Sequence, residues 1–334
     1  MIKFYTSFNK YYGDRALLLA DSIKKFCTGD FSVTALMVDK LNKREEKLFN
    51  SHFDNIVYPH EVLNCSDLVL NSHTVVEACT LFKPFALSHL LSTEDCDLAV
   101  YMDPDTMVVA DFAEYLRKLD KSTSVHLTPH LCYPADGISF HPAESSALKH
   151  GIYNLGYVAA RNDKVGRAFA DWWGRRILLT CAEGLGSGHF TDQKIIDMCP
   201  AVFPNVKIDR NPGLNIAPWN MHERKVSFGS ESLKANDSKA YFFHFSKINH
   251  VGAGEILRAC SDTGGALEIA LFYKSWMERK TNLALQAGLR SEWAYAQDEE
   301  GNRRTENSRL KNRAEYPKKV MQILDELKIE RSLN

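Results

Sequence analysis

The segment from Asp97 to Val109 constrains the fold more than any other part of this 334-residue chain. Its apolar run, Leu98 to Met102, is short and bounded by charge, which is typical of a strand buried on both faces of a parallel sheet. Pro104 cannot donate a hydrogen bond to a sheet, so the strand ends there and leaves Asp103 and Asp105 at its carboxyl end. In open α/β sheets this edge is where ligands bind.

The two aspartates have two interpretations. Carboxylates held close together repel each other, and a divalent cation with a preference for hard oxygen ligands, magnesium or manganese, relieves that repulsion. A metal held in this way attracts a diphosphate. Alternatively, Asp-Pro-Asp is a solvated turn, because both residue types are common in turns. The pair alone leaves both interpretations open.

Apolar periodicity in the first sixty residues alternates between the strand and the helix pattern. We expect strands over Ile2 to Phe8, Phe31 to Val38 and Asn55 to Tyr58, and helices over Ala16 to Phe26, capped by Asp14, and over Glu45 to Phe53. This alternation predicts an α/β fold with a Rossmann-like, mostly parallel sheet flanked by helices.

Two polar residues fall at the same sheet edge as the aspartates. Thr6 lies at the end of the first strand and Asp39 follows the second, so both are candidates for holding a base and a ribose. Asp39 fits equally well as a cap of the next helix.

Lys83 precedes a proline inside the helical pattern from Ser72 to Leu91. Pro84 disfavours helix at the residue before it, so we expect a break or kink there. A lysine at such a break, close before the Asp97 strand, is a candidate for contacting a phosphate or a sugar. The alternative is an ordinary surface lysine.

The second half of the chain continues the alternation. We expect helices over Phe112 to Leu119, Lys164 to Thr180 and Leu267 to Leu285, strands over Ser124 to Leu127, Tyr153 to Arg161 and Ala240 to Phe245, and a long loop from Thr128 to Gly151. Gly156 in the strand from Tyr153 suggests a close approach of the backbone to another group. Of Trp172 and Trp173, at least one packs in the core, and the other is a candidate surface for stacking on a sugar.

Thr191 can cap a helix, which would place Asp192 and Gln193 in its first turn. Asp192 is then either a site residue or a carboxylate that complements the helix dipole. His244 lies near the end of its strand, where it is either a ligand or a core histidine with satisfied hydrogen bonds.

Composition excludes several classes of function. The formal net charge of −1 gives no electrostatic case for binding nucleic acid, and no apolar run approaches the ~20 residues that span a membrane. The first residues lack the apolar core of a signal peptide, and none of the eight cysteines forms a Cys-x-x-Cys pair, so we expect a cytoplasmic protein with reduced thiols. Residues 301–319 hold seven basic and two acidic residues, which fits peripheral contact with an anionic membrane or a solvated tail.

Taken in order, the Asp-x-Asp strand, the Asn-x-Gly strand from Asn154, the Asp-Gln pair at 192 and the late strand with His244 resemble the metal-dependent GT-A glycosyltransferases. They are most similar to the retaining enzymes of glycosyltransferase family 8, typified by glycogenin and bacterial lipopolysaccharide galactosyltransferases. The resemblance covers roughly residues 1 to 250. The segment from Asn215 to Arg224 looks like one in bacterial surface-polysaccharide glycosyltransferases, which leaves open a distinct family with the same fold.

The resemblance implies specific roles. It makes Asp103, Asp105 and His244 metal ligands for Mn²⁺ or Mg²⁺. It makes Asp192 and Gln193 catalytic residues beside the transferred sugar. The donor-binding residues that it suggests, together with those expected from the sheet edge, are Thr6, Asp39, Lys83, Asn154, Lys247 and His250. Lys247 and His250 stand where the family's His-x-x-Gly-x-x-Lys pattern has Gly and Lys, at positions for which the resemblance implies contact with the diphosphate.

The reaction implied is transfer of a hexose from a nucleotide diphosphate sugar, above all a UDP-sugar, to a glycan or lipid-linked hydroxyl, with retention, as in polysaccharide biosynthesis. It implies a GT-A catalytic domain over residues 1–260, divided into a nucleotide-binding half (1–110) and an acceptor half (111–260), and a helical C-terminal extension over 261–334. The alternatives are a non-catalytic nucleotide-sugar or carbohydrate-binding protein, a metal-dependent phosphatase and a sugar nucleotidyltransferase. Met107 stands where such a phosphatase has Thr or Val, and the amino terminus lacks the glycine-rich Arg/Lys loop of a nucleotidyltransferase.

Overall fold

A computed structural model of the chain describes residues 1–64, 66–134, 142–181, 188–229, 232–246, 265–289, 293 and 295. Its strands are β1 (Ile2–Phe8), β2 (Phe31–Met37), β3 (Asn55–Val57), β4 (Leu98–Met102), β5 (Thr106–Val108), β6 (Val125–Pro129), β7 (Tyr153–Arg161), β8 (Val206–Ile208), β9 (Val226–Phe228), β10 (Leu233–Ala235), β11 (Ser238–Lys239) and β12 (Phe242–His244). Its α-helices are α1 (Gly13–Phe26), α2 (Lys43–Asn50), α3 (Pro59–Val62), α4 (Ser66–Ser72), α5 (Val75–Leu81), α6 (Lys83–Leu91), α7 (Phe112–Arg117), α8 (Pro142–His150), α9 (Lys164–Thr180), α10 (Cys199–Val202) and α12 (Ala266–Gln286). The 3₁₀ helices among the described residues are η1 (Lys10–Tyr12), η3 (Lys194–Met198) and η4 (Pro218–Glu223).

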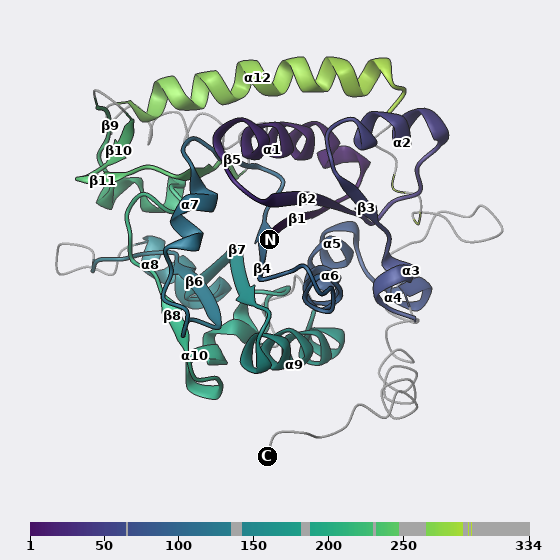
Figure 1. Ribbon diagram of the computed structural model, residues 1–334, viewed down its shortest axis with the longest axis horizontal. Coiled ribbons are helices and arrows are strands. Elements are labelled where there is room, and N and C mark those ends of the chain that lie inside the picture. The colour runs from purple at the N-terminus through teal and green to yellow at the C-terminus, as the bar shows by residue number, and fades with distance from the viewer. Residues whose placement is uncertain are drawn as a thin grey trace.

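A seven-stranded sheet in the order β3-β2-β1-β4-β7-β6-β8 forms the centre of the molecule. Its pairs are parallel except those that β7 makes with β4 and β6. Helices α1 and α12 lie on one side of the sheet and α6 and α9 on the other (Figure 1). The mixed, mostly parallel α/β fold expected from the sequence is therefore confirmed.

Each face of the sheet buries its own hydrophobic core, because successive side chains of a strand point to opposite faces. In β1, Phe4 and Phe8 pack on the α1 side, whereas Tyr5 packs on the α6 and α9 side. Trp173 is fully buried in the core on the α6 and α9 side, so at least one of the two tryptophans packs in the core, as expected. Trp172 is partly buried against the ring of Phe203.

Several local expectations are wrong in detail. Asp14 lies in the first turn of α1, not at its N-cap. Asn42 caps α2 through its side chain, so Asp39 is not the cap. Thr191 has φ 40° and starts no helix; Asp192 and Gln193 precede η3. The long loop expected after Thr128 contains α8, and α4 was not expected.

The break expected at Lys83 is confirmed, since α5 ends at Leu81 and α6 begins at Lys83.

Among the helices given above, none combines the length and hydrophobicity that crossing a lipid bilayer requires. Residues Lys247 and His250, and the basic stretch 301–319, lie outside the described residues.

A network of buried polar side chains connects β6 with β7, with α7 and with the residue that follows β8. The Asp209 carboxylate accepts hydrogen bonds from Tyr115 Oη at 2.6 Å and from His126 Nε2 at 2.8 Å. Since the carboxylate only accepts, His126 carries its proton on Nε2, and its Nδ1 accepts from Tyr157 Oη at 2.7 Å. Burial alone would raise the pKa of Asp209, but these bonds outweigh it and hold that pKa well below its usual range.

We predict that Asp209→Asn lowers the free energy of unfolding by about 2 kcal/mol near neutral pH, the scale of hydrogen bonds to a charged group. Because the folded-state pKa of Asp209 is depressed, its contribution is present above the unfolded-state pKa and is lost as pH falls through the folded value. Urea unfolding should therefore show a smaller difference between the two proteins at about pH 3 than at about pH 7. Asp237→Asn, at an exposed hairpin, is the control. A difference that is independent of pH would contradict the role given to Asp209.

Candidate active site

A cavity of about 720 Å³ opens at the carboxyl ends of β1 and β4. Its wall comes from segments that are distant in sequence: the end of β1 and η1, α5, the turn after β4, α8, the start of β7, the segment before η3, and η4. Of the expected site residues, it is lined by Lys83, Asp103, Asp105, Asn154, Asp192, Gln193 and His244. This is the sheet edge at which the sequence predicted a ligand.

Asp103, Asp105 and His244 converge on one point of this wall. One ligand atom from each lies within 4.8 Å of the others, a spacing that suits a metal ion. His244 reaches the aspartates because β12 pairs antiparallel with β5, which sets it opposite Thr106. Its Nε2 lies 3.1 Å from Asp105 Oδ1 and 3.7 Å from Asp103 Oδ2.

The interpretation of Asp-Pro-Asp as a solvated turn is wrong, because Asp105 is 7% exposed. Burial raises the pKa of the Asp105 carboxyl, but the adjacent His244 outweighs it, so that pKa is lowered. Burial likewise lowers the pKa of His244, and Asp105 outweighs it and raises that pKa. The two groups therefore stabilise each other's charged form inside the protein.

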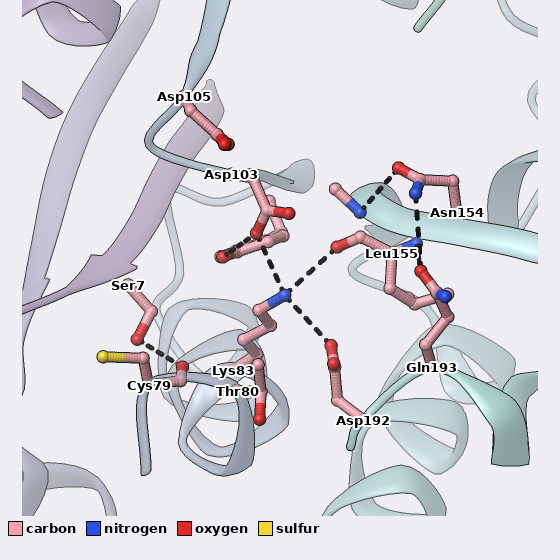
Figure 2. Close-up of polar contacts among 12 residues, drawn as sticks. Ser7, Cys79, Thr80, Lys83, Asp103, Asp105, Asn154, Leu155, Asp192 and Gln193 are labelled. Atoms are coloured by element: carbon pink, nitrogen blue, oxygen red, sulfur yellow. Dashed lines mark hydrogen bonds and ion pairs between the residues drawn. The ribbon is translucent and has the colours of Figure 1, made fainter. Parts of the chain in front are cut away.

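Lys83 lies at the centre of the polar contacts in Figure 2. Its Nζ contacts Asp103 Oδ1 at 3.0 Å, Asp192 Oδ2 at 3.1 Å and the Leu155 carbonyl oxygen at 3.3 Å. The lysine is buried, and its ammonium lies 4.3 Å from the ring centroid of Tyr101. The alternative of a surface lysine is therefore wrong.

The charges around Lys83 are coupled. Burial lowers the pKa of Lys83, but the carboxylates of Asp103 and Asp192 outweigh it, so that pKa is raised. Burial raises the pKa of Asp192; Lys83 opposes that shift and the charge of Asp103 adds to it. Tyr101 Oη donates a further hydrogen bond to Asp103 Oδ1 at 2.6 Å.

Gln193 is held mainly by backbone groups. Its Oε1 accepts from Leu155 N at 2.9 Å, and its Nε2 donates to the His150 carbonyl oxygen at 3.0 Å. Trp173 Nε1 donates to the Asp192 carbonyl oxygen at 3.0 Å. The backbone before η3 is therefore fixed from both sides, which aims Asp192 at the cavity.

At Gly156 the backbone comes close to neighbouring side chains, as the sequence suggested. A Cβ there would lie 2.4 Å from Cε1 of His244 and 2.7 Å from Oδ1 of Asn154. Glycine is required because His244 and Asn154 both lean against its backbone.

Thr6 and Asp39 do not line the cavity. Thr6 is buried in β1, and Ser7, the next residue, lines the wall. The Asp39 carboxylate is buried and accepts hydrogen bonds from the amides of Lys10 and Lys40.

Several cavity residues were missed by the sequence analysis. Tyr11 and Tyr12 on η1 and Trp219 on η4 line the wall, and the ring of Trp219 lies 5.0 Å from that of His244. Asn215 is fully buried behind His244. The double tyrosine after β1 was a usable signal, since it follows a strand that ends at the ligand edge.

Comparisons with known proteins identify relatives and a shared fold. No protein-family model matches the chain. The uncharacterized proteins YfnF and YfnD of Bacillus subtilis (strain 168) are 29% and 26% identical to it. The match to YfnF covers 54% of this chain and 59% of YfnF, and the match to YfnD covers 67% and 71%. The matched region thus spans less than two thirds of YfnF.

Among solved structures, the galactosyltransferase LgtC in complex with donor and acceptor sugar analogs is similar, with a TM-score of 0.50. The identity is 14%, over 86% of this chain and 96% of LgtC. At this identity the likeness concerns the fold alone, and it agrees with the GT-A fold expected from the sequence.

We predict that Lys83→Met lowers the free energy of unfolding by about 3 kcal/mol, because it leaves the buried Asp192 carboxylate and the partly buried Asp103 carboxylate without their cation. Lys24→Met is the matched control. Lys24 pairs with Asp54 at 2.7 Å on the surface, where loss of an ion pair costs less than about 1 kcal/mol. Denaturant unfolding of both variants measures the difference, and equal losses would show that Lys83 contributes no more than a surface charge.

Proposed function

We propose that this protein is a metal-dependent glycosyltransferase that moves a hexose from a nucleotide diphosphate sugar, most suitably a UDP-sugar, to a hydroxyl of a glycan or lipid-linked acceptor. One observation carries the proposal: Asp103, Asp105 and His244 converge on the wall of a cavity at the carboxyl edge of a parallel sheet. The fold shared with a galactosyltransferase supports it.

The residues present fit a divalent cation. Two carboxylates and one imidazole form a donor set that suits manganese, and magnesium less well because of the nitrogen ligand. The ion, when bound, supplies positive charge to the leaving diphosphate as a Lewis acid.

The cavity residues fit the rest of the reaction. Breaking the bond between sugar and phosphate leaves positive charge on the sugar and negative charge on the diphosphate. Lys83 is a fixed cation beside Asp103, on the side of the leaving group. Asp192 is a buried carboxylate on the wall that stabilises the positive sugar, and it is a chemically reasonable nucleophile if a covalent intermediate forms.

The two ends of the cavity suit the two substrates. We assign Tyr11 and Tyr12, which offer aromatic surface, to the base of the donor, Asn154 to the place where donor and acceptor meet, and Trp219 to the acceptor; all four line the cavity. We further propose that Thr6 supports the donor end from within β1, that Lys247 and His250 contact the diphosphate, and that the protein is cytoplasmic, with residues 301–319 touching an anionic membrane. Polysaccharide biosynthesis is the pathway class that suits such a reaction.

We predict that UDP raises the unfolding temperature when Mn²⁺ is present and has little effect without it. At ~100 times its dissociation constant a ligand adds about 2.7 kcal/mol to stability, which a thermal scan detects readily. Asp105→Ala should abolish the metal-dependent shift and nearly all turnover of UDP-sugars. Asp97→Ala, before the opposite end of β4, should keep both. No shift with any nucleoside diphosphate would refute the donor site.

We also predict transfer with retention of anomeric configuration, read from the anomeric proton signals of the first product by NMR. Asp192→Asn should lower kcat by about 100-fold or more, because it removes the charge that faces the sugar. Asp171→Asn, on the surface of α9, should leave kcat unchanged. An inverted product would contradict retention, and binding of UDP-sugar without turnover would favour a non-catalytic binding protein.

A further inference from the structure

Asn215 lies directly behind the candidate metal ligands and has none of the roles described above. It is fully buried in the segment before η4 and has φ 51°, a left-handed conformation that asparagine tolerates better than most residues. Its backbone is held in place, since its carbonyl oxygen accepts a hydrogen bond from Asn220 Nδ2 at 3.1 Å. A buried asparagine in this conformation requires an explanation from its side-chain contacts.

The orientation of the Asn215 amide follows from a chain of hydrogen bonds that starts at a backbone group. Gly156 N can only donate, and it lies 3.0 Å from the side-chain oxygen of Asn154. That oxygen also faces Asn215 Nδ2 at 2.9 Å, so the Asn215 group on this side must be the donating NH₂. The same NH₂ donates to Thr128 Oγ1 at 3.1 Å. The Asn215 oxygen is therefore left to face His244.

This oxygen determines the protonation of one nitrogen of the imidazole, Nδ1. His244 Nδ1 lies 3.3 Å from Asn215 Oδ1, which only accepts, so Nδ1 must carry a proton. Without a metal ion Nε2 also carries a proton, because it lies 3.1 Å from Asp105 Oδ1. A divalent cation that takes the place of this Nε2 proton leaves the Nδ1 proton with Asn215, and the Nε2 lone pair then points to the ion shared with Asp103 and Asp105. Partners of this kind orient the histidine ligands of metal ions, and their loss weakens metal binding.

We propose that Asn215 is a positioning residue that holds His244 with Nδ1 protonated, so that Nε2 presents its lone pair to a divalent cation shared with Asp103 and Asp105. The inference rests on the proposed metal-dependent transfer, because that function gives the cation its purpose. Asn215 also joins the ligand to Asn154 on the cavity wall.

Two variants separate the contacts of Asn215, and a third is their control. Asn215→Ala removes every side-chain bond, whereas Asn215→Asp keeps an acceptor for His244 Nδ1 and loses the NH₂ that bonds Asn154 and Thr128. Asn205→Ala controls for alanine in a left-handed conformation, since Asn205 has φ 60° on the surface. Thermal unfolding of each variant confirms that it is folded.

The first measurement is Mn²⁺ affinity of the nucleotide-free protein, from the EPR signal of free Mn²⁺. We expect Asn215→Ala to weaken binding by about 10- to 100-fold, and Asn215→Asp and Asn205→Ala to stay within about threefold of the wild type. Wild-type affinity in Asn215→Ala, or equal weakening in Asn215→Asp, would overturn the proposal.

The second measurement is the ¹⁵N NMR spectrum of the metal-free protein at alkaline pH, where the imidazole is neutral, with His244→Gln used to assign the signal. Because Asp105 Oδ1 competes for a proton on Nε2, we expect a larger fraction of the Nδ1-protonated tautomer in the wild type and in Asn215→Asp than in Asn215→Ala. Equal fractions in the wild type and in Asn215→Ala would overturn the proposal. Normal Mn²⁺ and NMR results without turnover of any UDP-sugar would instead refute the proposed function.

Discussion

The contact of one buried ammonium with two carboxylates is the interaction on which the rest of this site depends. Asp103, Asp105 and Asp192 line one cavity, and carboxylates in such a place are costly unless they are paired. Lys83 lies between Asp103 and Asp192, and His244 lies against Asp105. Lys83 and His244 both come from outside the Asp-x-Asp segment, so the balance of charge in the site depends on the tertiary structure.

Patterns that are local in sequence predicted most of the fold. The run from Leu98 to Met102 identified β4 because a buried strand needs only its own apolar residues, and the spacing over Lys164 to Thr180 gave α9 with its observed bounds. Expectations failed where the outcome depends on which of two neighbouring residues faces the cavity. Thr6 and Ser7 are equally polar, and only the face of β1 that meets α5 determines which one reaches the cavity.

The sequence predicted the charged residues of the site but not the residues that hold them in position. Asp103, Asp105 and His244 carry recognisable chemistry, so their types and order were informative. Asn215 has no such signal, because its role depends on a left-handed backbone and on contacts with residues distant in the chain. The expected helix cap at Thr191 was wrong for a related reason: hydrogen bonds from Trp173 and Gln193 to the backbone, not a cap, fix that segment.

Gly156 is where the candidate metal ligand His244 and the cavity residue Asn154 come together. Because Gly156 has no side chain, the imidazole of His244 can pack against its backbone. The side-chain oxygen of Asn154 accepts a hydrogen bond from the Gly156 amide. Asn215 then bridges the two side chains, so the positions of Asn154 and of the imidazole beside the aspartates depend on each other. An Asp-x-Asp sequence without this glycine could keep its carboxylates but not the approach of the imidazole. The combination of Asp-x-Asp, Asn-x-Gly and a buried asparagine therefore specifies this site more sharply than the acidic pair does.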